Sequence, residues 1–303
     1  MKKYSYYPGC TLHTSAKEYD MSVRAVFSAL GVELIEIEDW NCCGALEVGI
    51  PLLAYALNAR NLALAERAGF DLVVPCSACF YNLARTDHAL RDEELRRRIG
   101  TNYARRIKVR HVLDVLANDL LDEIKMRVKR ELSMRVVPYY GCLTVRPSDF
   151  GFDDPNHPES MDRLLSALGA DVPKFPSKAK CCGGPILMTA EEVPLKMAGQ
   201  ILEEAKRVGA DAISVACPLC HLMLDAKQPD IEEALGKEFK VPILYFTQLV
   251  GLALDIKPRK LGLHKNVVPA REVVEKVLRQ ARRTLSVGRA AACSKKRERL
   301  RDS

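Results

Sequence analysis

The sequence of 303 residues has no apolar run that approaches the ~20 residues needed by a membrane-spanning helix. Its first residues, from Met1 to Ser5, lead into no apolar segment of the kind that directs secretion. We therefore expect a cytoplasmic chain without a membrane span. The length suits two domains of ordinary size.

Nucleotide-binding motifs are also missing. No GxGxxG follows a predicted strand, no phosphate-binding P-loop is present, and no ferredoxin-type run of cysteines accompanies the cysteines described below. A chain without these motifs has no means of its own of taking electrons from a nicotinamide. Any redox chemistry in this chain therefore depends on partner proteins for its electrons.

Cysteine, by contrast, is abundant, with eleven residues. Structural disulfides are rare in a reducing cytoplasm, so this number of thiols indicates metal binding or redox chemistry. All but Cys293 fall into two sets of one design: a lone cysteine, an adjacent pair followed by glycine, and a CxxC. The first set is Cys10, Cys42, Cys43, Cys76 and Cys79, and the second set is Cys142, Cys181, Cys182, Cys217 and Cys220.

The residues around the two sets repeat as well. Tyr-Tyr-Pro-Gly-Cys at 6–10 matches Pro-Tyr-Tyr-Gly-Cys at 138–142, and Phe-Ser-Ala-Leu-Gly at 27–31 matches Leu-Ser-Ala-Leu-Gly at 165–169. This order indicates the duplication of one module with two equivalent sites. We predict a first Cys-Cys-Gly module in residues 1–132, a second in residues 133–257 and a basic C-terminal tail in residues 258–303.

Strand and helix patterns alternate along each module. The patterns predict strands at 3–9, 32–37, 71–74 and 212–216, helices at 16–30, 52–68, 80–90 and 192–208, a closing strand and helix at 109–117 and 241–254, and a linking helix at 120–132. Such alternation is typical of an α/β fold. We expect each module to be a small parallel sheet with flanking helices, the two modules to be related by a pseudo-two-fold axis, and the cysteines to lie at the carboxyl ends of the strands.

The chemistry of the thiols has more than one interpretation. A CxxC alone is compatible with zinc, an iron–sulfur cluster or a redox-active pair, and a structural zinc or an ordinary cubane uses four ligands. Each set offers a fifth thiol, which favours a cluster of unusual nuclearity or a thiol left free to react. Adjacent cysteines reach one site only from an irregular backbone, which Gly44 and Gly183 allow. A helix that begins at the CxxC directs amide donors towards an anionic cluster.

Together with Phe-Thr-Gln-Leu at 246–249, these motifs resemble the B subunit of heterodisulfide reductase over about residues 3–257. The first cysteine pair continues as Gly44-Ala45, whereas methanogen members tend to carry proline after the pair, so the chain is more similar to bacterial members. The resemblance implies that each set holds a non-cubane [4Fe-4S] cluster. It also implies that the two clusters face one another across a substrate disulfide.

The function that the resemblance implies is that of a catalytic subunit of an oxidoreductase complex acting on sulfur groups. Methanogen members cleave the mixed disulfide of coenzymes B and M, and this chain is expected to reduce or form a small disulfide or to act on a sulfur carrier. The implied partners are the flavin-containing A subunit of that enzyme together with its ferredoxin-like C subunit. Nucleic acid is not among them.

Two alternatives remain at the level of the sequence. One is a Cys-Cys-Gly iron–sulfur subunit that transfers electrons within a quinone-linked dehydrogenase and does no disulfide chemistry. The other is a zinc-bound scaffold whose basic tail contacts nucleic acid.

Three further side chains are candidates for contact with a cluster or a substrate: His221 after Cys220, Lys180 before Cys181, and His13 near Cys10. Each also has an ordinary structural interpretation. The net charge of +7 comes from the tail, where residues 258–303 carry fourteen Lys and Arg against four Asp and Glu. We interpret the tail as a solvated terminus that contains Cys293 as a free surface thiol.

Overall fold

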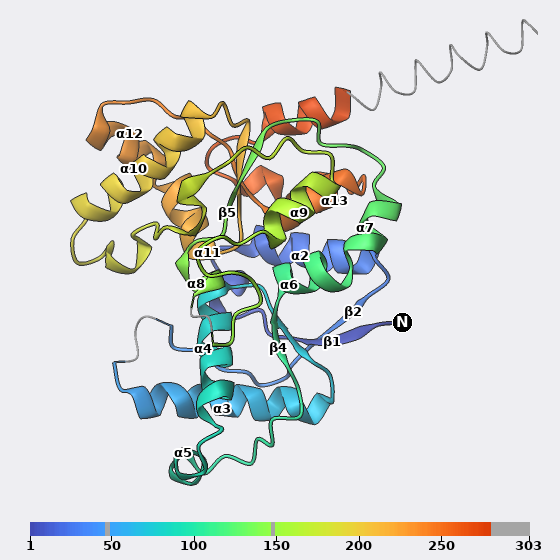
Figure 1. Cartoon of the computed structure of the whole chain (residues 1–303), viewed down its shortest axis with the longest axis vertical. Coiled ribbons are helices and arrows are strands. Elements are labelled where there is room, and N and C mark those ends of the chain that lie inside the picture. The colour runs from blue at the N-terminus through green and yellow to red at the C-terminus, as the bar shows by residue number, and fades with distance from the viewer. Residues whose placement is uncertain (46–48, 147–148, 280–303) are drawn as a thin grey trace, which may run out of the picture.

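The computed structural model describes residues 1–45, 49–146 and 149–279, and these residues contain two parallel β-sheets, one in each module (Figure 1). Strands and helices alternate, which confirms the predicted α/β class with two related modules. Cys293 and the last part of the tail lie outside the described residues.

The first sheet has the strand order β2-β1-β3-β4. Its strands are β1 (Lys3–Tyr6), β2 (Glu33–Glu36), β3 (Leu72–Val74) and β4 (Val109–His111). The helices of this module are α1 (Cys10–His13), α2 (Lys17–Ala29), α3 (Pro51–Ala68), α4 (Ser77–Ala89), α5 (Glu93–Ile99), α6 (Val112–Asp114), the π-helical turn η1 (Val115–Asp119) and α7 (Leu121–Arg127). The lone cysteine and the CxxC of the first set directly follow β1 and β3.

The second sheet has the order β5-β6-β7. Its strands are β5 (Val136–Tyr139), β6 (Ala212–Val215) and β7 (Ile243–Tyr245). The helical elements are α8 (Cys142–Val145), α9 (Ser160–Ala167), η2 (Pro176–Ala179), η3 (Gly184–Ile186), α10 (Glu192–Arg207), α11 (Pro218–His221), the π-helical turn η4 (Leu222–Ala226), α12 (Gln228–Leu235), α13 (Phe246–Ala253) and η5 (Leu263–Lys265). Where the first sheet has β2, the described part of this module has a single bridge between Arg135 and Asp171.

Local sequence explains the ends of the longest helix. Pro51 occupies the start of α3, where its missing N–H costs no hydrogen bond, and Gly69 ends the helix at φ +78°. In α4, Cys76 is the N-cap residue, so the helix begins inside the CxxC. The expected helix start at the cysteines is therefore present.

The two modules share one core because each packs its early helix against the other module's last helices. Figure 1 shows α2 among the helices of the second module, next to α13, while α9 lies against α6 and η1 of the first module. The buried hydroxyls of Ser22 and Thr247 are 2.6 Å apart at the contact of α2 with α13. This reciprocal packing is the pseudo-two-fold relation that the repeat predicts.

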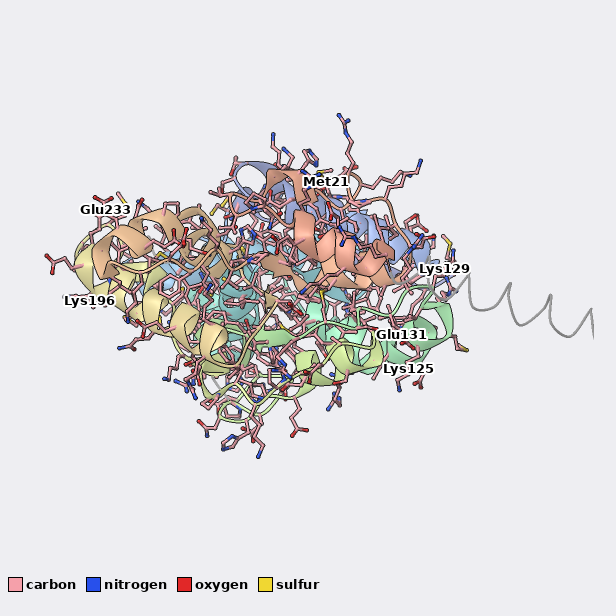
Figure 2. The ribbon with its side chains drawn as sticks, turned by 90° about the horizontal axis from the view of Figure 1, so that it is seen from above. Met21, Lys125, Lys129, Glu131, Lys196 and Glu233 are labelled. Atoms are coloured by element: carbon pink, nitrogen blue, oxygen red, sulfur yellow. The ribbon has the colours of Figure 1, made fainter. Side chains whose placement is uncertain are left out.

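The connection between the modules is less helical than expected, since α7 ends at Arg127 and residues 129–132 continue as an irregular segment. Figure 2 shows Lys125, Lys129 and Glu131 together at one edge of the molecule, where this connection runs. The boundaries at 132 and 257 stay predictions.

The described part of the tail, residues 258–279, packs against the body of the protein. Leu261, Val273 and Val277 are buried. Our interpretation of the whole tail as a solvated terminus therefore does not hold for these residues, because their apolar side chains join the core.

Candidate functional site

The thiols of the first set converge at the carboxyl ends of β1 and β3. The Sγ atoms of Cys10 and Cys42 are 3.5 Å apart, and those of Cys43 and Cys79 are 3.3 Å apart. In the second set Cys142 contacts Cys181, and Cys220 contacts Cys182 and Cys217. Cys76 is buried and contacts Cys217. The structure thus brings together each set and also places the two sets next to one another.

A tyrosine fixes each Cys-Cys-Gly loop to the strand that carries the lone cysteine. Tyr7 donates its hydroxyl hydrogen to the carbonyl of Asn41 at 2.8 Å, and Tyr139 donates to the carbonyl of Lys180, also at 2.8 Å. Both tyrosines lie three residues before a lone cysteine, and both carbonyls belong to the residue before a cysteine pair. The duplicated motif is therefore also duplicated in its hydrogen bonding.

The glycine before each lone cysteine lets a sulfur of the CxxC approach the backbone. A Cβ atom on Gly9 would lie 2.9 Å from Cys79 Sγ, and one on Gly141 would lie 2.8 Å from Cys220 Sγ. Both glycines also have a positive φ, of +74° and +70°. A larger residue at either position would displace a thiol.

Amide groups surround the cysteine pairs. The backbone N–H groups of Gly44 and Gly183 point to the sulfurs of Cys42 and Cys181, each at 3.4 Å. The side chain of Asn58 donates to the carbonyl of Cys43 at 2.9 Å. N–H donors to sulfur are one of the factors that set the potential of an iron–sulfur cluster.

The two cysteine pairs have the same electrostatic asymmetry. The hydrogen bond between Cys42 and Cys43 lowers the pKa of Cys43 to about 4 and raises the pKa of Cys42. The hydrogen bond between Cys181 and Cys182 lowers the pKa of Cys182 and raises that of Cys181. In each pair the buried second cysteine is the one whose thiolate form is favoured, and the thiolate is the form of cysteine that binds metals.

These observations fit an iron–sulfur cluster at each set. The donors are thiols that share protons, the backbone adapts to the sulfurs at Gly9 and Gly141, and N–H groups face the sulfurs. Within residues 1–45, 49–146 and 149–279, no group of three or more His, Cys, Asp or Glu side chains is arranged to hold a single metal ion. The residues that would hold the clusters are the ten cysteines of the two sets.

A cavity of about 370 Å³ adjoins the first set. All five cysteines of this set line one side of it. The other side comes from α2 and from the second module, with Glu18, Pro218, Leu219, His221, Leu222, Asp225, Tyr245, Lys265 and Val267. The cavity therefore includes the space of the predicted cluster itself and extends from it to a mixed polar and apolar surface of α2 and the second module.

The three non-cysteine candidates have different surroundings. His221 is buried, lines the cavity and stacks on Tyr245 with ring centroids 4.4 Å apart. His13 is exposed and lies 3.3 Å from a carboxylate oxygen of Glu36, and Lys180 is an exposed residue. Their roles at the site stay predictions.

The sequence did not identify several residues of the site. Tyr7 and Tyr139 have a readable signal, since both recur three residues before a lone cysteine. Glu18, Asp225 and Tyr245 have no such signal, because they come from three distant segments that meet only in the folded chain.

The comparisons with known proteins agree with this geometry. A family described as "Cysteine-rich domain" (CCG) matches residues 4–84 and 136–225, one copy in each module. The 8-methylmenaquinol:fumarate reductase membrane anchor subunit of Wolinella succinogenes is 37% identical, over 89% of this chain and 98% of that protein. In the described part of this chain, no helix is long and apolar enough to cross a membrane.

Two archaeal relatives are named after the B subunit of heterodisulfide reductase. The heterodisulfide reductase B-subunit-like protein of Archaeoglobus profundus is 32% identical, over 93% of this chain and 100% of its own length. The B subunit of the ferredoxin/F(420)H(2)-dependent CoB-CoM heterodisulfide reductase of Methanosarcina acetivorans is 29% identical, over 91% of this chain and 97% of its own.

Among solved structures, a hypothetical protein from Helicobacter pylori has a TM-score of 0.67 at 14% identity, which shows a shared fold. The match covers 88% of this chain and 52% of the other. Two matched copies of the cysteine-rich domain, and relatives along almost the whole length, establish that this chain belongs to the duplicated CCG-domain family that includes the B subunit of heterodisulfide reductase.

Proposed function

We propose that this chain is the substrate-handling subunit of a cytoplasmic oxidoreductase complex that reduces or forms a disulfide beside two non-cubane [4Fe-4S] clusters. The observation that carries the proposal is the cavity of about 370 Å³, which has the five thiols of the first set on one side and residues of the second module on the other. A cluster would fill the cysteine side of this cavity, whereas the side lined by Glu18, Asp225 and Tyr245 has no cluster ligand. A pure electron carrier has no use for that second part of the cavity, and a substrate does.

When bound, the clusters would supply one-electron transfer and iron sites with affinity for sulfur. The chain itself shapes the reaction in three ways. Tyr7 and Tyr139 hold the cysteine pairs in place, the amides of Gly44 and Gly183 stabilise negative charge on sulfur, and the second module limits the space available to a substrate.

Electrons must come from other proteins, because the sequence has no nicotinamide or flavin motif. The partners that we propose are two other proteins of the complex, one ferredoxin-like and one that contains a flavin. The contact of Cys76 with Cys217 would give a short path between the two clusters, so that electrons reach the cavity one at a time.

A second candidate function is favoured by the relative from Wolinella succinogenes, which is named a subunit of 8-methylmenaquinol:fumarate reductase and is 37% identical. In that case the chain would transfer electrons between a quinone and a dehydrogenase, and the cavity would have no disulfide substrate.

Spectroscopy on the protein prepared without oxygen separates these functions. The holoprotein is partly oxidised with and without a small thiol such as 2-mercaptoethanol, and its EPR spectrum is recorded. A paramagnetic signal that depends on the thiol supports disulfide chemistry at the site. Clusters that respond to a quinol analogue but are indifferent to thiols would instead favour the quinone-linked function.

A further inference from the structure

The cavity beside the first set contains a polar group that has no partner. Tyr245 lines the cavity and its side chain is completely buried. Within the part of the chain that the structure describes, its hydroxyl makes no hydrogen bond. A buried hydroxyl without a partner is unfavourable, so a ligand or water in the cavity is the natural partner.

The ring of Tyr245 is held rigidly. It stacks on Tyr19 with centroids 4.0 Å apart and planes 6° apart, and on its other face His221 stacks at 4.4 Å and 8°. The backbone N–H of Tyr245 also donates to the side-chain oxygen of Gln248 at 3.0 Å. The hydroxyl is therefore presented in a fixed position without any reorganisation of the protein.

Two buried carboxyl groups line the same cavity. Asp225 lies in the π-helical turn η4 and accepts hydrogen bonds from the N–H groups of Val267 and Val268 at 2.7 and 3.0 Å. Glu18 comes from α2 and has no ion pair within 4.0 Å among the described residues. π-Helical turns occur frequently at functional sites.

Burial of these two carboxyl groups favours their protonated form. Burial raises the pKa of Asp225 to about 6, and burial together with the charge of Asp225 raises the pKa of Glu18. Lys265 of η5 acts in the opposite direction on Glu18, and His221 of α11 lies 4.0 Å from Asp225. A negative charge on Asp225 therefore favours a proton on Glu18.

The corresponding place in the other module is different. His111 and Phe80 stand where the second module has Tyr245 and His221. There Phe152, from a loop without a counterpart in the first module, stacks on His111 with planes 7° apart and contacts Phe80 with centroids 5.9 Å apart. The equivalent position in the first module is thus covered by the ring of Phe152, so the two cysteine sets are not equivalent towards a substrate.

We propose that Glu18, Asp225 and Tyr245 form a proton-donating wall for a small disulfide bound in the cavity, which makes the first set the site where substrate is protonated. This inference rests on the proposed function. Tyr245 donates a hydrogen bond to one substrate sulfur, and Glu18 transfers its proton to the sulfur that is released.

The overall step is balanced as RS–SR′ + 2 e⁻ + 2 H⁺ → RSH + R′SH. The sulfur–sulfur bond breaks, two S–H bonds form, and the two electrons come from the ferredoxin-like partner. Glu18 holds one proton at a time, so it takes up a second proton from solvent between the two electron transfers.

Two variants test the wall, both in the full chain with its clusters. Tyr245→Phe removes only the hydroxyl, and Glu18→Gln removes the exchangeable proton with little change in shape. Glu233→Gln is the matched control, since Glu233 is an exposed residue of α12 at the periphery of the molecule (Figure 2) and does not line the cavity. The disulfide of 2-mercaptoethanol serves as the probe.

Binding is measured by calorimetry and thiol release by a single-turnover reaction with a chemically reduced protein. Tyr245→Phe is expected to raise the dissociation constant about tenfold, the effect of one lost hydrogen bond. Glu18→Gln is expected to leave binding within about twofold and to slow thiol release about 100-fold, with a changed pH profile. The control resembles the wild type in both measurements.

Each outcome decides the matter. If the wild type binds and reduces the probe but the two variants behave like Glu233→Gln, the wall is overturned and the proposed function stands. If the wild type has clusters but neither binds nor reduces the probe, the proposed function fails and the wall fails with it. Should Glu18→Gln not fold, Tyr245→Phe decides alone, because the hydroxyl that it removes supports no other group.

Discussion

At the scale of single residues, the site depends on tyrosines whose hydroxyls differ in their partners. Tyr7 and Tyr139 each hold one Cys-Cys-Gly loop by a hydrogen bond of 2.8 Å, whereas the equally buried hydroxyl of Tyr245 has no partner among the described residues. The same amino acid therefore holds a loop by its hydroxyl at two positions, whereas at the third it lines the cavity and its hydroxyl is unpaired among the described residues.

This difference predicts different costs for the same substitution. Tyr7→Phe and Tyr139→Phe should each lower the free energy of unfolding by about 1 kcal/mol, because each loses a hydrogen bond within the protein. Tyr245→Phe should leave the free energy of unfolding unchanged or slightly raised, because its hydroxyl has no partner among the described residues. Denaturant unfolding of the three variants under anaerobic conditions compares them directly, and an equal loss in all three would contradict the assignment.

A second prediction concerns His111, which is completely buried. Burial lowers the pKa of His111 to about 4 from 6.5. As the pH falls, His111 is protonated in the unfolded chain before it is protonated in the folded protein. The contribution of neutral His111 to the free energy of unfolding is therefore fully present above about pH 6.5 and is lost towards pH 4. The loss is on the order of 3 kcal/mol for a shift of this size.

The test compares wild type with His111→Gln, which keeps an acceptor for the N–H of Leu113. Unfolding midpoints are measured at pH 7 and pH 5. The wild type should lose more stability between these values than the variant does. Identical losses would mean that His111 is not the buried neutral group described above.

At the scale of elements, the segment after α13 completes the cavity. Lys265 and Val267 of this segment line the cavity, and Gly262 seats the segment against the start of α2. A Cβ atom on Gly262 would lie 2.6 Å from the backbone of Glu18, and Gly262 has φ +71°. The position therefore accepts only glycine without movement of the segment.

Gly262→Ala should lower the free energy of unfolding by about 1–3 kcal/mol, through overlap with α2 and an unfavourable φ. Gly236→Ala is the control for the effect of φ alone, because Gly236 has φ +61° and no atom near its missing Cβ. Thermal unfolding of both variants measures the difference. Gly262→Ala should lose more free energy of unfolding than Gly236→Ala, and equal losses would contradict the close contact of Gly262 with α2.

The elements also indicate how far sequence reasoning reaches. Strands before the cysteines, the helix that starts at Cys76 and the helix that ends at Gly69 follow from local patterns and appear as expected. The contact of Cys76 with Cys217 and the approach of α2 to α13 do not, because they depend on how two modules exchange helices. Long-range packing leaves no local signal in one sequence.

The same limit applies to the site. The ten cysteines were identified because their spacing recurs, and Cys10 with Cys42 and Cys43 with Cys79 are indeed neighbours. Glu18 falls within the helix predicted at 16–30 without a signal of its own, and Lys265 and Val267, which line the cavity with it, come from a distant segment of the chain.

At the scale of the whole molecule, the two modules form one cooperative unit. Each module's early helix packs on the other module's last helices, so neither can unfold without exposing the other's core. We expect a single unfolding transition for both modules. Thr247→Val, which removes the contact of 2.6 Å with Ser22, should lower its midpoint without splitting it.

Circular dichroism and near-ultraviolet absorbance followed through the same denaturant series provide this measurement. The Ser22 hydroxyl keeps its bond to the carbonyl of Tyr19 at 2.9 Å, so the expected cost is about 1 kcal/mol. Two separate transitions would show that the modules are independent.

The most direct test of the account is the iron and acid-labile sulfide content of the anaerobically prepared protein, measured together with Cys43→Ser and Cys182→Ser. Wild type should contain about eight irons and as many sulfides per chain. Each variant, which removes one ligand of one set, should lose about half of both. Zinc in place of iron, without labile sulfide, would contradict the account and indicate a structural metal site.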